Sequence, residues 1–101
     1  MAMLKTNLKL PENNGKLDIF FKNDEDDVPE VMIIGDPDGL RYLSEVLKAL
    51  ADYDQDSRNL PKGEREHIHL HSKCQLGKHS CEVEICRADA KGTGELPNFM
   101  R

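Results

Sequence analysis

Three histidines at alternate positions, His67, His69 and His71, carry the clearest chemical potential in this sequence. Side chains alternate across a β-strand, so a strand over residues 66–72 would place all three imidazoles on one face, with successive rings about 6.5–7 Å apart. Ile68 and Leu70 would then point to the opposite face. Imidazoles at this spacing can chelate zinc, so the segment is a candidate metal site as well as a candidate polar surface.

A second alternating segment, residues 81–87, follows closely enough to pair with the histidine strand as an antiparallel hairpin. Glu82, Glu84 and Cys86 share one of its faces, where they can supply a third zinc ligand or simply pair with the imidazoles. Structural zinc sites more often contain closely spaced cysteine pairs, so we expect no bound metal and no other cofactor. The alternative is a metal-binding module that uses His67, His69 and His71.

The cysteines do not indicate a catalytic nucleophile. Cys81 alternates with Val83 and Ile85, so we expect a small core side chain, and buried thiols of this kind are inert. Cys74 has histidines within a few residues, but the sequence shows no acid that would orient them. We therefore expect that the protein is not an enzyme.

Charge favours a basic partner. Four consecutive carboxylates repel one another, and they predict a solvated turn between strands or, alternatively, an acidic patch for a basic ligand. They are Asp24, Glu25, Asp26 and Asp27. The formal net charge of -5 argues against a nucleic-acid or membrane-surface binder, because such proteins present a basic face.

The element that must position these groups is a predicted helix over residues 36–53. Asp36 suits the N-cap position, and Pro37 then occupies the first helical position, where its missing N–H costs nothing. An apolar stripe at helical spacing needs a sheet to cover it. The stripe comprises Leu40, Leu43, Leu47, Leu50 and Ala51.

Further strands precede this helix. Residues 3–23 predict a hairpin that turns at Asn14-Gly15, with Leu17, Ile19 and Phe21 on one face of its second strand. Residues 31–34 form a continuous apolar run, which predicts a well-buried strand that leads into the helix.

The predicted order is β-β-β-α-β-β. It corresponds to an α+β fold: a small, largely antiparallel sheet of four to five strands with one amphipathic helix packed on one face. The expected core comprises Ile19, Ile33, Leu40, Leu43, Leu47, Leu50, Ile68, Leu70, Val83 and Ile85. We expect one domain over residues 1–101, in which 88–101 is a loosely held tail with Leu96 and Phe99 as candidate anchors.

The N-terminal residues 1–10 alternate apolar and polar side chains and contain no continuous apolar stretch. They do not resemble a signal peptide or a transmembrane span. We therefore expect a cytoplasmic protein whose cysteines are reduced.

Residues 31–87 resemble the bacterial immunity protein family catalogued as immunity protein 32. The resemblance rests on four short segments: Gly35-Asp36, Gly39-Leu40, His69-Leu70-His71 and Glu82-Val83-Glu84-Ile85. It implies a non-enzymatic protein that binds and neutralises a cognate secreted toxin. The acidic composition suits a toxin with a basic surface.

Because the helix covers one face of the predicted sheet, we expect the partner on the other face. The expected contact residues are His67, His69, His71, Glu82, Glu84, Asp24, Glu25, Asp26 and Asp27. A structural or oligomerising domain that uses the same open face is the remaining alternative.

Overall fold

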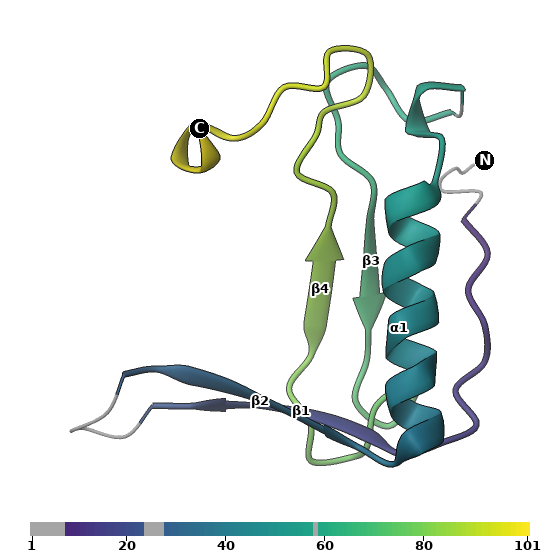
Figure 1. Ribbon diagram of the computed structural model, residues 1–101, viewed down its shortest axis with the longest axis vertical. Coiled ribbons are helices and arrows are strands. Elements are labelled where there is room, and N and C mark those ends of the chain that lie inside the picture. Colours follow the sequence, from purple (N-terminus) through teal and green to yellow (C-terminus); the bar gives the residue numbers. More distant parts are fainter. Residues whose placement is uncertain (1–7, 24–27, 58) are drawn as a thin grey trace.

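The computed structural model describes residues 8–23, 28–57 and 59–101. Its elements are β1 (Leu17–Lys22), β2 (Glu30–Gly35), α1 (Pro37–Asp52), a 3-10 turn η1 (Gln55–Ser57), β3 (His67–Leu70), β4 (Val83–Cys86) and a 3-10 turn η2 (Asn98–Met100). The α+β class is confirmed. The strands form two separate antiparallel pairs, β1–β2 and β3–β4, so the expectation of a single sheet is wrong (Figure 1).

Helix α1 begins where the sequence predicts. The Asp36 side chain accepts a hydrogen bond from the Gly39 N–H at 2.7 Å, and Pro37 opens the helix. This cap satisfies one of the N–H groups that a helix leaves unpaired at its start. The helix ends at Asp52, directly before Tyr53, which is the last residue of the predicted range.

The buried stripe of α1 differs from the predicted one. Tyr42, Val46 and Leu50 are buried, whereas the side chains of Leu40 and Leu47 are 46% and 45% exposed. Both sets recur at helical spacing, so periodicity alone could not choose between them. A two-stranded sheet covers only a narrow part of a helix surface, and here it covers the side that carries Tyr42 and Val46.

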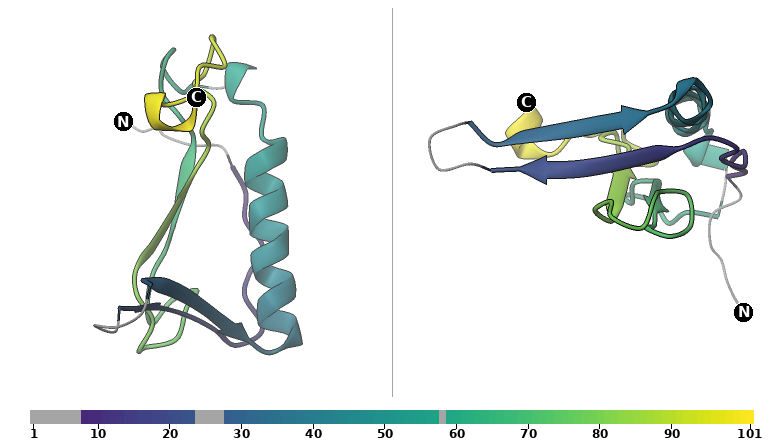
Figure 2. Two further views of the ribbon diagram at one scale, coloured as in Figure 1. Left: turned by 60° about the vertical axis from the view of Figure 1, so that its left-hand side comes forward. Right: turned by 90° about the horizontal axis from the view of Figure 1, so that it is seen from below.

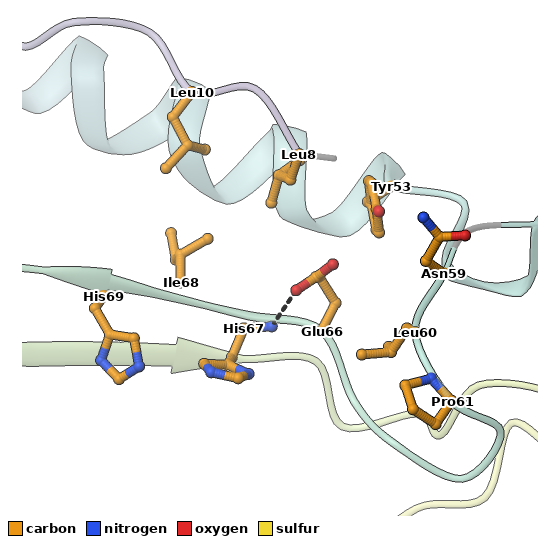
Figure 3. Close-up of a pocket in the computed structure, with 10 residues that line it drawn as sticks. All are labelled: Leu8, Leu10, Tyr53, Asn59, Leu60, Pro61, Glu66, His67, Ile68 and His69. Carbon is orange, nitrogen blue, oxygen red and sulfur yellow. Dashed lines mark hydrogen bonds between the residues drawn. The ribbon is translucent and has the colours of Figure 1, made fainter. Parts of the chain in front are cut away.

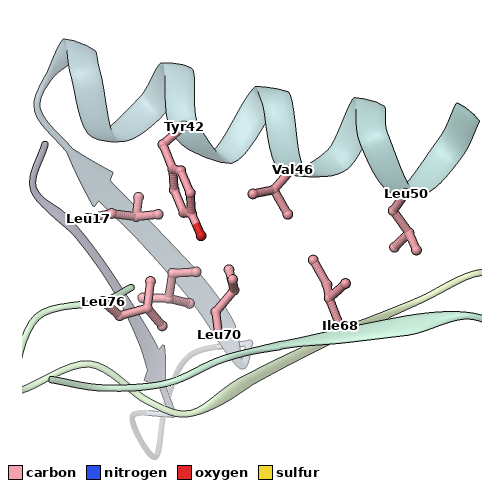
Figure 4. Close-up of a cluster of buried hydrophobic side chains, with 8 residues drawn as sticks. Leu17, Tyr42, Val46, Leu50, Ile68, Leu70 and Leu76 are labelled. Atoms are coloured by element: carbon pink, nitrogen blue, oxygen red, sulfur yellow. The ribbon is translucent and has the colours of Figure 1, made fainter. Parts of the chain in front are cut away.

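The β3–β4 pair packs under this stripe. Ile68 and Leu70 are buried against α1, and Val83 and Ile85 of β4 pack partly against the same cluster. The expected division of β3 into an apolar and a polar face is therefore confirmed. The core is one contiguous cluster (Figure 4) made up of Leu17, Ile19, Tyr42, Val46, Leu50, Ile68, Leu70 and Leu76.

The β1–β2 hairpin leaves the body of the protein near the start of α1, where β2 leads directly into the helix (Figures 1 and 2). Its six residue pairs run from Leu17 opposite Gly35 to Lys22 opposite Glu30. Only its base is buried: the backbone carbonyls of Leu17 and Ile19 accept hydrogen bonds from Gly77 and Cys81 at 3.0 and 2.8 Å. The rest of the hairpin extends outward.

The expectation of a buried strand over residues 31–34 is wrong, and so is the core role of Ile33. The strand exists, but its four apolar side chains are between 38% and 59% exposed. A strand that is buried on both faces needs a packed layer on each side, and the single α-helix among the described residues does not supply two such layers. We call this outward-extending β1–β2 hairpin the apolar arm.

The predicted hairpin over residues 3–23 is also wrong in its described part. Residues 8–16 form no strand; they run alongside α1 (Figure 1). Asn13 accepts a hydrogen bond from the Gly15 N–H at 2.9 Å, so a local side-chain turn replaces the expected strand pairing. Residues 3–7 lie outside the described residues.

The chain after β4 folds back onto the loop that precedes β3. Gly63 and Lys91 are joined by a backbone hydrogen bond of 2.9 Å, Lys91 and Glu64 by one of 2.8 Å, and Ala90 is buried. Phe99 is 87% exposed, so it does not anchor this segment, and Leu96 is also exposed. Within the described ranges, no helix is long and apolar enough to cross a membrane.

Candidate functional site

The outer face of β3–β4, which points away from α1, carries the predicted histidines. We call it the polar face and define it by His67, His69, His71, Glu82, Glu84 and Cys86. The three imidazoles form a row, with ring centroids 5.1 Å apart for His67 and His69 and 6.0 Å apart for His69 and His71. Figure 3 shows Ile68 pointing toward α1 while the His67 and His69 rings point the other way.

The carboxylates of the polar face lie beside the histidines, as the alternation predicted. His69 is directly opposite Glu84 in the β3–β4 register. The Nδ1 atom of His71 lies 3.5 Å from a Glu82 oxygen, and that oxygen also accepts a hydrogen bond from the Ser72 N–H at 2.8 Å. These exposed side chains are therefore already oriented by their neighbours.

Cys86 joins the same face opposite His67. Its thiol donates a hydrogen bond to Glu84 Oε2 at 3.2 Å. Partial burial is the main cause that raises the pKa of the Cys86 thiol, and the hydrogen bond to Glu84 and the negative charge of Glu84 raise it further. The thiol is therefore protonated near neutral pH and is not an activated nucleophile.

One other sequence-based expectation about this region is wrong, and another lies outside the described residues. Cys81 is exposed rather than part of the core, because it precedes β4 and its backbone N–H bonds to β1. The acid run Asp24, Glu25, Asp26 and Asp27 joins β1 to β2 and lies outside the described residues.

The structure brings together a different set of potential metal ligands from the three histidines. Ligand atoms of His67, Glu84 and Cys86 all lie within 4.8 Å of one another. The set combines one residue of β3 with two of β4, so it depends on the register of the hairpin. A pattern within one strand could not identify it.

The opposite side of β3 borders a pocket of about 620 Å³ (Figure 3). Its walls are largely apolar and include Leu8, Leu10 and Ile68. The buried Glu66 carboxylate accepts a hydrogen bond from the backbone N–H of His67 at 3.1 Å. Tyr53, Asn59 and Glu66 add polar groups to this lining, whereas the His67 and His69 rings point to the other side of β3 (Figure 3).

A polar network beyond this pocket closes the C-terminal end of α1, and the sequence analysis missed it. The Arg87 guanidinium donates to the Leu50 and Tyr53 carbonyl oxygens at 3.1 and 2.8 Å and forms an ion pair of 2.6 Å with Asp89. The hydrogen bond from Arg87 lowers the pKa of Asp89. The buried Gln55 side chain extends the network by donating to the Asp89 carbonyl oxygen at 2.7 Å. No short-range pattern links residues so far apart in sequence.

The apolar arm is a second surface that the sequence analysis did not predict. Its exposed large hydrophobic side chains are Phe21, Val31, Met32, Ile33 and Ile34. Contiguous exposed apolar side chains are typical of interaction surfaces. The arm extends past the β3–β4 pair on the side away from α1, which is the side of the polar face (Figure 2).

Comparison with known proteins gives one family. The sequence model of the family described as immunity protein 32 matches residues 30–88. The match begins with the first residue of β2 and includes α1, β3 and β4. Neither the curated proteins nor the solved structures yield a match to this chain.

Proposed function

The chain belongs to the immunity protein 32 family, and on that premise we propose that it binds and neutralises a cognate secreted bacterial toxin without itself being an enzyme. The observation that carries this proposal is the family match over residues 30–88, which contains the polar face. The absence of an activated thiol at Cys86 is consistent with a binding role.

The toxin binds, in this proposal, to the polar face. Helix α1 occupies the opposite side of β3–β4, so the polar face is open to a large partner, and its histidines and carboxylates are exposed. Glu82 and Glu84 add local negative charge to a chain with a formal net charge of -5. This charge complements a basic toxin surface and would accelerate the encounter of the two proteins.

Two features favour this surface over a generic acidic patch. Glu82 is held by His71 and Ser72, so binding would immobilise few additional side-chain rotations there. The apolar arm lies on the same side and can supply the hydrophobic contacts that stable interfaces place at their centre. We also propose that the acid run 24–27 contributes to the long-range attraction of the toxin.

We further propose that the protein acts in the cytoplasm. All three cysteines are unpaired and exposed. Exposed thiols persist in a reducing compartment, whereas oxidising compartments favour disulfides.

Charge reversal tests the proposed surface. The double variant Glu82→Lys with Glu84→Lys should fold and yet protect poorly against a toxin encoded beside the gene, when growth of a co-expressing strain is measured. Association of the purified proteins should slow, and the difference from the parent should shrink at high salt because screening weakens exposed charges.

A matched control reverses two other exposed carboxylates, Glu12→Lys with Glu45→Lys, and changes the net charge equally. It should protect nearly as well as the parent. If the polar-face variant folds and protects as well as this control, the polar face is not the toxin-binding surface.

A further inference from the structure

Three different metal-ligand types converge at one end of the polar face. His67 and Cys86 are directly opposite each other in the β3–β4 register, and Glu84 lies two residues before Cys86 on the same face. An imidazole nitrogen, a carboxylate oxygen and a cysteine sulfur lie within 4.8 Å of one another. These are the three side-chain donors that zinc uses in proteins.

We propose that His67, Glu84 and Cys86 bind a zinc ion on the outer face of β3–β4. This proposal replaces our sequence-based expectation of a metal-free protein, and it differs from the three-histidine alternative. The site shares His67 and Glu84 with the proposed toxin-binding face, but it does not require a bound toxin, because all three ligands come from this chain.

The spacing of the donors suits this ion. Tetrahedral zinc holds nitrogen, oxygen and sulfur at about 2.0–2.3 Å, which places neighbouring donors roughly 3.5 Å apart. The Cys86 sulfur is already 3.2 Å from Glu84 Oε2, to which its thiol donates a hydrogen bond, and zinc would replace that proton, which leaves to solvent as the thiolate forms. All three side chains are exposed, so small rotations about their side-chain bonds can bring the remaining distances to the required value without disturbing the core.

The environment of His67 also suits a ligand. Its Nδ1 atom lies 3.4 Å from the Arg65 carbonyl oxygen. A proton on Nδ1 is favoured by this acceptor and leaves the Nε2 lone pair for a metal, the arrangement that commonly orients histidine ligands. The Arg65 guanidinium itself is held by the carbonyl oxygens of Ala88 and Glu95 at 2.6 and 2.7 Å.

The mixed donor set favours zinc over harder cations. Magnesium and calcium prefer oxygen ligands, whereas a thiolate and an imidazole select zinc and related transition metals. Three protein ligands leave one tetrahedral position for water. The ion would therefore lie at the surface with an exchangeable ligand.

Cobalt substitution provides a direct test, because cobalt(II) bound to a thiolate gives an absorption band that oxygen-only binding does not. The reduced full-length protein should bind one cobalt(II) per chain with this sulfur-to-cobalt band, and zinc should displace the cobalt. Cys86→Ser should abolish the band, and His67→Ala should weaken binding at least about tenfold, since even residues that only orient ligands contribute about 10–100-fold.

Matched controls use the other cysteines and histidines. Cys81→Ser, Cys74→Ser and His71→Ala should bind cobalt like the parent, and circular dichroism should show that every variant is folded. No thiolate band in the parent, or an unchanged band in Cys86→Ser, would overturn the proposal. Cys86→Ser keeps both polar-face carboxylates, so loss of metal can be separated from loss of toxin binding.

Discussion

The described residues form two antiparallel hairpins that differ in how they pack on the core. In β3–β4 the apolar side chains alternate with polar ones, and Ile68 and Leu70 are buried against α1. In β1–β2 the apolar residues of β2 are consecutive, and both faces of its outer part are exposed. Alternation therefore identified the packed hairpin correctly, whereas overall apolarity did not.

This difference shows that the number of layers available to cover a strand decides whether its apolar side chains are buried. Alternating apolar residues require only one covering layer, and α1 provides that layer for β3–β4. A continuous apolar strand requires two layers, so β2 remains largely exposed. A two-stranded ribbon is marginally stable alone, and the arm depends on its anchored base, where Leu17 and Ile19 enter the core.

The largest expected effect is on the free energy of unfolding when a buried side chain of β3 is truncated, compared with an exposed one in the arm. Leu70→Ala should lower the free energy of unfolding by about 2–5 kcal/mol, because it leaves a cavity at a fully buried site. Ile33→Ala in the arm, where the side chain is half exposed, should cost far less. Urea denaturation of both variants measures the contrast, and equal costs would mean that the arm is packed in solution.

A second substitution tests how the arm is joined to the helix. Gly39 lies in the first turn of α1, and a Cβ atom there would collide with the backbone oxygen of Lys16, just before β1. Helix propensity alone predicts that Gly39→Ala stabilises by about 1 kcal/mol. We expect instead a loss of about 1–3 kcal/mol from the collision. Thermal unfolding decides between the two signs.

The third substitution concerns the stripe of α1. Leu47 is nearly half exposed, so Leu47→Ala should cost about 1 kcal/mol or less, in contrast to the larger loss that the predicted stripe implied. Val46→Ala, one position away and fully buried, is the matched comparison. A loss in Leu47→Ala as large as in Val46→Ala would restore the stripe predicted from the sequence.

The smallest effect appears in acid. Hydrogen bonds from the backbone of Lys16 and Gly39 lower the Asp36 pKa, and Arg87 lowers that of Asp89. A carboxyl with a lowered folded pKa stabilises the protein above its unfolded pKa, about 3.9, and that stabilisation is lost as the pH falls through the folded value.

In Asp36→Asn, which removes the carboxyl beside the base of the arm, the free energy of unfolding should therefore fall less on acidification than in the parent. Asp89→Asn, which removes the carboxyl after β4, should have the same effect. Urea midpoints measured between about pH 2 and pH 5 check both, since this window spans the unfolded carboxyl pKa. A parent whose midpoint is constant over that window would show that neither carboxyl contributes.

Local chemistry made part of the fold predictable. The Asp36 cap, the helix that follows it and the inward direction of Ile68 and Leu70 are all set by neighbouring residues. The partner of β1 could not be predicted in this way. Asn14-Gly15 suits a hairpin turn, but the fold uses Asn13 in a local turn, and β1 pairs instead across the acid run with β2.

The candidate site, like the fold, could be predicted only in part from the sequence. A shared face for His67, His69 and His71 follows from alternation along one strand, and the proximity of Glu82 follows from the short connection between the strands. The grouping of Cys86 with His67 depends on the exact register of β3 and β4. A shift of one residue would move Cys86 to the other face, so the spacing in sequence could not determine the ligand set.

The anchoring of β1 at its base has a mechanical consequence. Loop 77–81 holds the backbone of Leu17 and Ile19, whereas the described residues farther along the ribbon are joined mainly by their own cross-strand bonds. If a ribbon held only at its base bends, the described residues farther from that base would move more than those at it. Such bending would change the direction in which Val31 and Met32 point while the anchored base stays in place. The direction of the apolar arm could therefore change without a change in the packing of the core.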